Sequence, residues 1–308
     1  MKPGEGNILV IRGGAIGDFI LTLPVLAALR RHYREAGIEV LGYPHIAQLA
    51  MAGGLADAVH SIESRALANF FARNGQLDQS LEQFFSGFTV IVSYLFDPDG
   101  IFESNVARCS RARFIAGPHR PDETQAVHAS ESLLKPIEQL GIRNPDPVPY
   151  LSIPAHPASL AQLALHPGSG SEKKNWPEEN WIRLIQHLLS VSPLQLLLVG
   201  GDAETDRLRR LDAACNGPRL RLLQHLPLTE LAARLRGCAG FIGHDSGISH
   251  LASALGLPVL VLWGESKEVV WGPRGERVTV LRSPEGLQGL SLERVADALG
   301  HFLPWLEN

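Results

Sequence analysis

Short apolar runs alternate with longer amphipathic segments along the chain, and this alternation restricts the fold more than any other feature. The apolar runs are rich in Val, Ile and Leu without polar alternation, which is typical of parallel strands covered on both faces. Strand and helix patterns that follow one another this often predict doubly wound parallel sheets of the α/β class. The predicted strands are Ile8–Arg12, Glu39–Gly42, Ala56–Ile62, Thr89–Tyr94, Arg113–Ala116, Leu163–His166, Gln195–Val199, Leu220–Leu223, Gly240–Gly243, Val259–Trp263 and Val278–Leu281.

A proline-rich stretch divides the chain. Residues 141–157 contain five prolines, which fix φ and remove backbone donors, so this stretch is predicted to be an extended linker. The length of 308 residues suits two domains of about 150 residues each. We expect domains over residues 1–150 and 151–308, with a ligand cleft between the carboxyl ends of their sheets. The predicted helices are Ile20–Arg34, Glu123–Gln139, Glu178–Leu189, Ala203–Cys215, Thr229–Arg236, Ser246–Leu255 and a terminal helix over residues 291–303, for which packing back onto the N-terminal domain is left open.

Composition excludes several classes of protein. The net charge of -4 argues against nucleic-acid binding through a broad positive field. The three cysteines form no CxxC pair, so free thiols in a reducing compartment are expected. Arg12 and Asp18 interrupt the first apolar stretch, and no run approaches the roughly 18 apolar residues of a membrane span. We expect a soluble, cytoplasmic protein; peripheral association with the inner membrane face is left open.

The loop after the first strand carries glycines and one acidic residue. Gly13–Gly17 lacks the GxGxxG spacing, and the second strand ends in Gly42 and Tyr43 without an acidic residue. Both features disfavour a dinucleotide site. Asp18 follows near a helix start. One interpretation is an N-cap carboxylate; the other is a general base that takes a proton from an incoming hydroxyl.

The loop after the sixth predicted strand, His166–Pro177, contains small residues followed by lysine. Ser169, Gly170 and Ser171 expose backbone N–H groups, and Lys174 follows. These groups suit phosphate oxygens, although the spacing is not that of a Walker A motif. The alternative is a solvated Gly/Ser loop with surface lysines.

A helix start follows the strand that ends at Gly243. The free N–H groups of Ser246 and Gly247, together with the helix dipole, predict an anion site. His250 lies one turn on and either faces this site or only packs within the helix. Asp245 would repel a diphosphate, so it is expected to cap the helix or to bond a hydroxyl or a loop amide. The Asp, Ser and His of this segment are too close in sequence for a hydrolytic triad.

No acidic pair is placed to hold a metal ion with a diphosphate. Asp97 and Asp99 flank a proline and are predicted to form a turn. We therefore expect no metal cofactor, with positive charge and the helix dipole in its place.

Three motifs in one order make the chain resemble glycosyltransferase family 9, the ADP-heptose:lipopolysaccharide heptosyltransferases. They are Gly17–Pro24, then His166–Ser169 with Lys174–Pro177, and then Asp245–Ala252, with Trp271–Pro273 as a further likeness. The resemblance implies a GT-B fold, with two Rossmann-like domains facing across a cleft. It also implies that the N-terminal domain binds the acceptor and the C-terminal domain binds the nucleotide-sugar donor.

The resemblance also implies roles for individual residues. The base aspartate of the family corresponds to Asp18 and its phosphate-contacting lysine to Lys174, for which the adjacent Lys173 could substitute. The diphosphate-binding helix start corresponds to Ser246 and Gly247, and a ribose-binding glutamate to Glu204, where the local match is looser.

The expected reaction is inverting, metal-independent transfer of heptose from ADP-heptose to a lipopolysaccharide-core or other glycan acceptor, with no nucleic-acid partner. The alternatives are an NAD-dependent oxidoreductase, a nucleotide-sugar epimerase and a binding protein without transferase activity.

Overall fold

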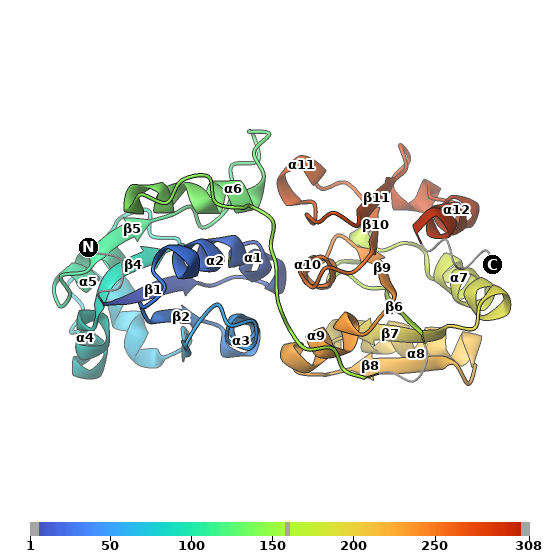
Figure 1. The fold of residues 1–308 in the computed structure, drawn as a ribbon, viewed down its shortest axis with the longest axis horizontal. Helices are drawn as coiled ribbons and strands as arrows, with labels where there is room; N and C mark the ends of the chain where they lie inside the picture. Colours follow the sequence, from blue (N-terminus) through green and yellow to red (C-terminus); the bar gives the residue numbers. More distant parts are fainter. Residues whose placement is uncertain (1–5, 158–160, 303–308) are drawn as a thin grey trace. The chain divides into compact units, whose positions relative to one another are not determined.

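A computed structural model of the chain describes residues 6–157 and 161–302 (Figure 1). The chain forms two compact units that divide between Pro149 and Tyr150, within the proline-rich stretch. Each unit contains one sheet in which all neighbouring strands are parallel. The prediction of doubly wound parallel sheets is confirmed.

The N-terminal unit has a five-stranded sheet in the order β3-β2-β1-β4-β5. The chain runs outward from β1 to β3 and then returns to place β4 on the other side of β1. The strand order therefore reverses between β1 and β4, and ligands of such sheets bind at the carboxyl ends of the strands at this point. The elements are β1 (Asn7–Arg12), α1 (Ile16–Ile20), α2 (Leu23–His32), β2 (Ile38–Gly42), α3 (Pro44–Ala52), β3 (Ala58–Ser61), η1 (Arg65–Phe71), α4 (Gln79–Ser86), β4 (Phe88–Ser93), α5 (Ile101–Ala107), β5 (Arg113–Ala116), α6 (Ala129–Leu134) and η2 (Lys135–Leu140).

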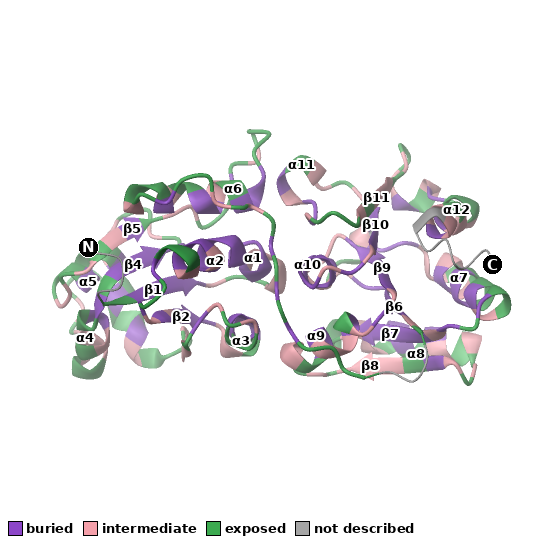
Figure 2. Ribbon diagram, in the orientation of Figure 1, coloured by how far each residue is buried: buried purple, intermediate pink, exposed green. Residues whose placement is uncertain are grey.

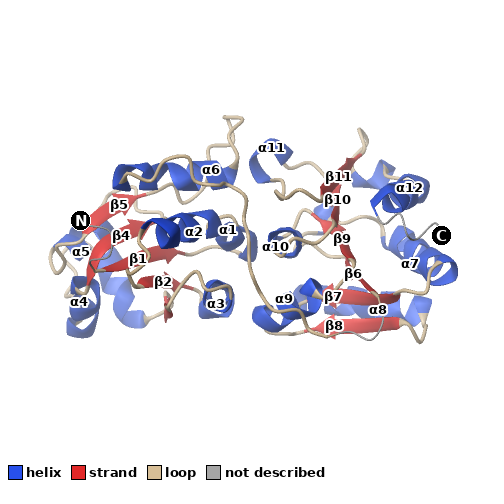
Figure 3. Cartoon of the chain, in the orientation of Figure 1, coloured by secondary structure: helices blue, strands red, loops and turns tan. Residues whose placement is uncertain are grey.

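Phenylalanines fill one face of this sheet. Phe70, Phe85 and Phe102 are fully buried against Leu9 and Ile91 of the central strands. The ring centroids of Phe70 and Phe85 are 4.9 Å apart. Burial of such a side chain contributes about 1.5–3 kcal/mol. This cluster anchors η1, α4 and α5 to the sheet. Figure 2 colours the central strands of this unit as buried, and Figure 3 marks the strands and the helices around them.

The C-terminal unit has a six-stranded sheet in the order β11-β10-β9-β6-β7-β8. This is the strand order of a complete doubly wound Rossmann sheet, and the reversal lies between β6 and β9. Helix α12 packs on α7 and next to β10 and β11. The elements are β6 (Gln162–His166), η3 (Glu172–Lys174), α7 (Glu178–Val191), β7 (Gln195–Gly200), η4 (Asp202–Glu204), α8 (Thr205–Cys215), β8 (Leu220–Gln224), α9 (Leu228–Arg236), β9 (Gly240–His244), α10 (Gly247–Ala254), β10 (Val259–Trp263), α11 (Glu268–Trp271), β11 (Val278–Arg282), η5 (Leu287–Gly289) and α12 (Leu292–Phe302).

The predicted helix Ile20–Arg34 begins too early, because α2 covers only Leu23–His32 of it and a separate short helix, α1, ends at Ile20. Pro24 lies in the first turn of α2. Its ring cannot donate a backbone hydrogen bond and clashes with the carbonyl four residues earlier, so one helix must end and another begin there. The prediction also missed α1 as a separate helix, which begins at Ile16.

The predicted helix Glu123–Gln139 begins too early. Asp122 accepts hydrogen bonds from the backbone N–H and hydroxyl of Thr124, at 2.9 and 2.7 Å, which forms a local turn instead. His128 then caps α6 by accepting from the Ser130 N–H at 3.2 Å. Helices α3, α4 and α5 lie between strands, where the alternation predicts helices, but the sequence analysis named no ranges for them. The last residue of the predicted terminal helix, Leu303, lies outside the described residues.

No helix among the described residues has both the length and the apolar character that a membrane span needs. The thiols of the three cysteines are free, as predicted. Burial raises the pKa of the Cys238 thiol to about 12.

Candidate active site

Asp18 lies in the first turn of α1, directly after the loop that follows β1. Its carboxylate accepts a hydrogen bond from the Ala15 N–H at 2.9 Å. Ala15 occupies the N-cap position of α1, and Asp18 bonds its N–H as the N3 residue of a capping box does. The interpretation of Asp18 as a carboxylate that accepts a backbone N–H at the helix start is therefore confirmed, although Asp18 is not the N-cap residue itself. Gly14 has a φ of +99°, and a side chain there would meet the Asp18 carboxylate at 2.7 Å. A glycine is therefore needed for the loop to fold back over Asp18.

Arg12, at the end of β1, is a buried cation beside this carboxylate. Its side chain is 4% exposed, and Nη2 lies 3.4 Å from Oδ1 of Asp18. Nη1 donates to the His119 carbonyl at 2.9 Å, and the guanidinium lies 6.0 Å from the centre of the Tyr94 ring. Burial lowers the pKa of Arg12, and the Asp18 charge opposes this effect. The sequence reasoning missed this residue, although a charge at the end of a buried strand was a usable signal.

In the C-terminal unit, the point of strand reversal brings two predicted loops together. β6 and β9 pair with His166 opposite Gly243, so the loops that follow them begin next to each other. Both His166 and His244 are buried at these strand ends. The loop after β6 carries Ser169, Gly170 and Ser171, and the segment after β9 leads into α10.

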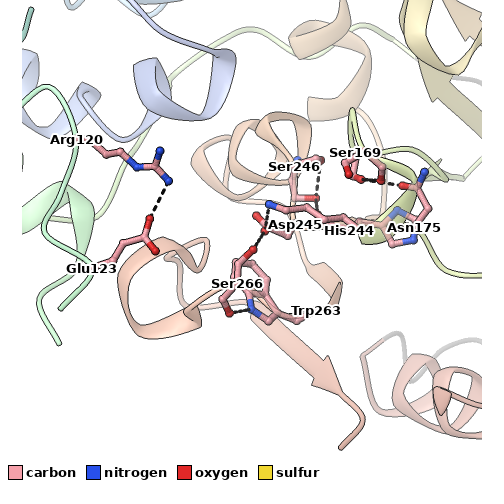
Figure 4. Close-up of polar contacts among 12 residues, drawn as sticks. Arg120, Glu123, Ser169, Asn175, His244, Asp245, Ser246, Trp263 and Ser266 are labelled. Carbon is pink, nitrogen blue, oxygen red and sulfur yellow. Dashed lines mark hydrogen bonds and ion pairs between the residues drawn. The ribbon is translucent and has the colours of Figure 1, made fainter. Parts of the chain in front are cut away.

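The loop after β6 is held by its own polar side chains. The hydroxyl of Ser169 lies 2.8 Å from Oδ1 of Asn175 and 2.9 Å from the Ser171 carbonyl (Figure 4). Lys174 ends the short helix η3 and its side chain is 42% exposed. The side chain of Lys173 lies outside the described residues, so the choice between the two lysines stays open.

Lys174 and Asp245 form an ion pair that joins the two loops. Nζ lies 2.6 Å from Oδ2 of Asp245, which is 11% exposed. The hydroxyl of Ser266 donates to the same oxygen at 2.5 Å, and the Trp263 indole donates to the Ser266 carbonyl at 2.8 Å (Figure 4). Asp245 therefore bonds a hydroxyl, one of the two roles expected for it, and does not cap α10. The sequence reasoning missed the pairing with Lys174.

Ser246 caps α10, as predicted for this helix start. Its hydroxyl accepts from the Ser249 N–H at 3.4 Å and lies 3.4 Å from Nδ1 of His166. Burial lowers the pKa of His166 to about 4, with the Glu204 charge opposing this effect. Gly247 is the first residue of α10, and His250, one turn on, is buried. The backbone amides at this end of α10 and its dipole favour an anion.

Glu204 closes one side of the loop after β6. Its carboxylate accepts from the Gly201 N–H at 2.9 Å. A side chain at Gly168 would lie 2.1 Å from Cγ of Glu204, so the loop packs directly on this glutamate. The structure thus places the predicted ribose-binding residue beside the predicted phosphate loop.

Asp97 takes part in the predicted turn between β4 and α5. Its two carboxylate oxygens accept from the backbone N–H groups of Phe102 and Glu103 at 3.1 and 3.0 Å. The prediction of a turn there is confirmed. In a separate loop of the same unit, Arg120 pairs with Glu123 at 2.8 Å (Figure 4).

Two Rossmann-like units in one chain, each with a polar site at the reversal of its strand order, have the architecture of the GT-B fold. A family model described as "Glycosyltransferase family 9 (heptosyltransferase)" matches residues 111–295. The chain therefore belongs to glycosyltransferase family 9, which confirms both the predicted family and the predicted class of enzyme.

Individual proteins are similar to different extents. Lipopolysaccharide heptosyltransferase 1 of Escherichia coli K12 is 32% identical over 130 residues, which is 42% of this chain and 40% of that protein. The match thus spans less than half of this relative. A family 9 glycosyltransferase from Veillonella parvula has a TM-score of 0.81 at 18% identity and covers 99% of both chains. An E. coli heptosyltransferase with ADP has a TM-score of 0.76 at 19% identity, over 96% of this chain and 99% of that one.

Proposed function

We propose that the protein transfers a heptose from ADP-heptose to a lipopolysaccharide-core or related glycan acceptor, with inversion at the anomeric carbon and without a metal ion. Membership of family 9 supports the class of reaction. The solved E. coli relative with ADP supports the choice of nucleotide.

The observation that carries the proposal is the Lys174–Asp245 ion pair of 2.6 Å at the start of α10. It holds a cation beside backbone amides that favour negative charge. In a nucleotide sugar, the diphosphate is the anionic part that a lysine and free backbone amides would bind. The amides of Ser169–Ser171 lie in the loop that carries the same lysine.

In the proposed reaction, Asp18 accepts the proton of an acceptor hydroxyl while its oxygen attacks the anomeric carbon. The bond from that carbon to the diphosphate breaks, and ADP leaves with the electron pair. Lys174 and the α10 amides stabilise the charge that grows on ADP. A preorganised donor of this kind is worth about 3 kcal/mol, and a general base adds about 10²–10⁴-fold.

The donor is tested by thermal shift with ADP-, UDP-, GDP- and dTDP-sugars. The correct donor at about 100 times its Kd should add roughly 2.7 kcal/mol of stability. Calorimetry with ADP then compares Lys174→Ala with Lys173→Ala, which decides between the two lysines. We expect the larger loss of binding in Lys174→Ala. Wild-type affinity in that variant would refute the role of Lys174.

The base is tested with Asp18→Asn. We expect turnover to fall by about two decades or more, while ADP affinity stays at the wild-type level. Asp78→Asn is the control, because the Asp78 carboxylate also accepts backbone hydrogen bonds at the start of a helix, as the N-cap of α4, at 2.9 Å from the Ser80 N. Unchanged turnover in Asp18→Asn would exclude the base.

Metal independence and stereochemistry need separate assays. Turnover should continue in EDTA, and NMR of the product should show inversion at the anomeric carbon. Loss of activity on chelation, restored by adding a divalent ion, would contradict the metal-free mechanism. Location at the inner membrane face is a further part of the proposal, to be tested by cell fractionation.

A further inference from the structure

His244 is a buried polar residue to which the proposed reaction gives no role. It ends β9 and its side chain is fully buried. Nε2 of its ring lies 2.8 Å from the backbone N of Trp176, whose N–H donates to it. Nδ1 lies 3.2 Å from the Gly168 carbonyl. Because Nε2 accepts, Nδ1 must carry the proton and donate to Gly168.

Both bonds would be costly to lose. Gly168 and Trp176 are themselves buried, and a buried backbone group without a partner costs about 1–3 kcal/mol. The ring packs edge-on against Trp181, with centroids 5.4 Å apart. Burial lowers the pKa of His244 to about 3, which keeps the ring neutral and the two bonds in place. A packing role alone would need no such pair of hydrogen bonds.

The two bonded groups lie at opposite ends of the loop after β6. Gly168 immediately precedes Ser169–Ser171, and Trp176 follows Lys174 by two positions. A single ring therefore ties together both ends of the segment that carries the proposed phosphate contacts. Figure 4 shows His244 together with Ser169 and Asn175 of this loop.

We propose that His244 is a positioning residue for donor binding, because it fixes the loop that presents Lys174 and the Ser169–Ser171 amides to the diphosphate. This inference rests on the proposed function for the identity of the ligand. The physical reason is preorganisation: a loop already held in its binding conformation loses less entropy when the ligand binds.

The test compares three substitutions of His244. His244→Leu removes both hydrogen bonds. His244→Gln is long enough to accept from Trp176, and His244→Asn is suited to donate to Gly168, so each retains one bond. Trp181→Phe is the matched control, because it disturbs the packing around the ring without removing either bond. The measurements are ADP affinity by calorimetry, thermal stability, and hydrogen exchange of the Trp176 amide.

We expect ADP binding about tenfold weaker in His244→Leu, the equivalent of one good hydrogen bond. Binding should be partly restored in the Gln and Asn variants. Lys174→Ala should weaken ADP binding less in the His244→Leu background than in the wild type. The Trp176 amide should lose protection in His244→Leu beyond the loss that Trp181→Phe produces.

Two results would overturn the inference. One is wild-type ADP affinity in a folded His244→Leu variant, whether or not the Trp176 amide stays protected. The other is a loss of affinity in Trp181→Phe that matches His244→Leu. Failure of the proposed function has a different signature: the wild-type protein would bind no ADP, while the exchange of the Trp176 amide would still report whether His244 fixes the loop.

Discussion

Acidification should destabilise the C-terminal unit through His166 and His244. The pKa values of these residues are lowered to about 4 and about 3, in both cases chiefly by burial. Glu204 opposes the shift of His166, and the Gly168 carbonyl opposes that of His244. Since an unfolded histidine has a pKa of about 6.5, the unfolded chain binds protons more readily. The stability that these two neutral rings contribute is fully present above about pH 6.5. It is lost as the pH falls from there toward the pKa values of the two histidines in the folded protein.

The magnitude follows from these values. Between about pH 7.5 and about pH 5, each unfolded histidine takes up nearly one proton that its folded counterpart does not. Integration of this difference gives about 2 kcal/mol per residue. The two residues together give about 4 kcal/mol, a large part of the roughly 5–15 kcal/mol that holds a typical protein folded.

Urea denaturation at about pH 7.5 and at about pH 5 measures this loss in the free energy of unfolding. The His244→Gln variant should lose about 2 kcal/mol less than the wild type on acidification, because one of the two titrating groups is gone. His187→Gln is the control, since His187 is exposed on α7. An identical pH dependence in the wild type and His244→Gln would refute the argument that the buried neutral ring of His244 carries this share of the stability.

Two further predictions concern the same loops. Gly168→Ala should cost about 1–3 kcal/mol of stability, because the new methyl group would lie 2.1 Å from Cγ of Glu204; wild-type stability in denaturation would show that Glu204 moves away freely. Ser249→Ala should cost about 1–3 kcal/mol, because the buried Ser249 hydroxyl donates to the His244 carbonyl at 2.5 Å. Ser190→Ala, which removes an exposed bond of 2.7 Å, should cost less, and equal losses would contradict this reasoning.

The strands could be predicted because their signal is local. Runs rich in Val, Ile and Leu mark several of the buried parallel strands, and the predicted runs for β1, β7 and β10 agree with the structure to within one residue. Helices were predicted less well where polar side chains compete with the backbone. Asp122 forms a turn in place of the expected helix start, and Pro24 places the start of another helix later than expected. The second of these was readable from the sequence, since proline in a helix pattern is a known boundary.

Residues of the candidate site could be found where they follow strands. Asp18, Lys174 and Ser246 all follow closely after predicted strands, and in an α/β sheet that position alone is informative. Their partners could not be found in this way. Lys174 and Asp245 are 71 positions apart, and Trp176 and His244 are 68 apart. No local pattern specifies which of several distant polar groups will meet once the sheet has formed.

The Lys174–Asp245 pair changes how the two loops of the C-terminal unit should be understood. From the sequence they were two separate phosphate-binding motifs, and Asp245 was a charge that would repel a diphosphate. In the structure its carboxylate receives both Lys174 and the Ser266 hydroxyl, and it directly precedes the cap of α10. The acidic residue therefore draws the lysine of one loop to the helix start of the other. The two motifs thereby form one candidate site, in which the Lys174–Asp245 pair lies at the start of α10.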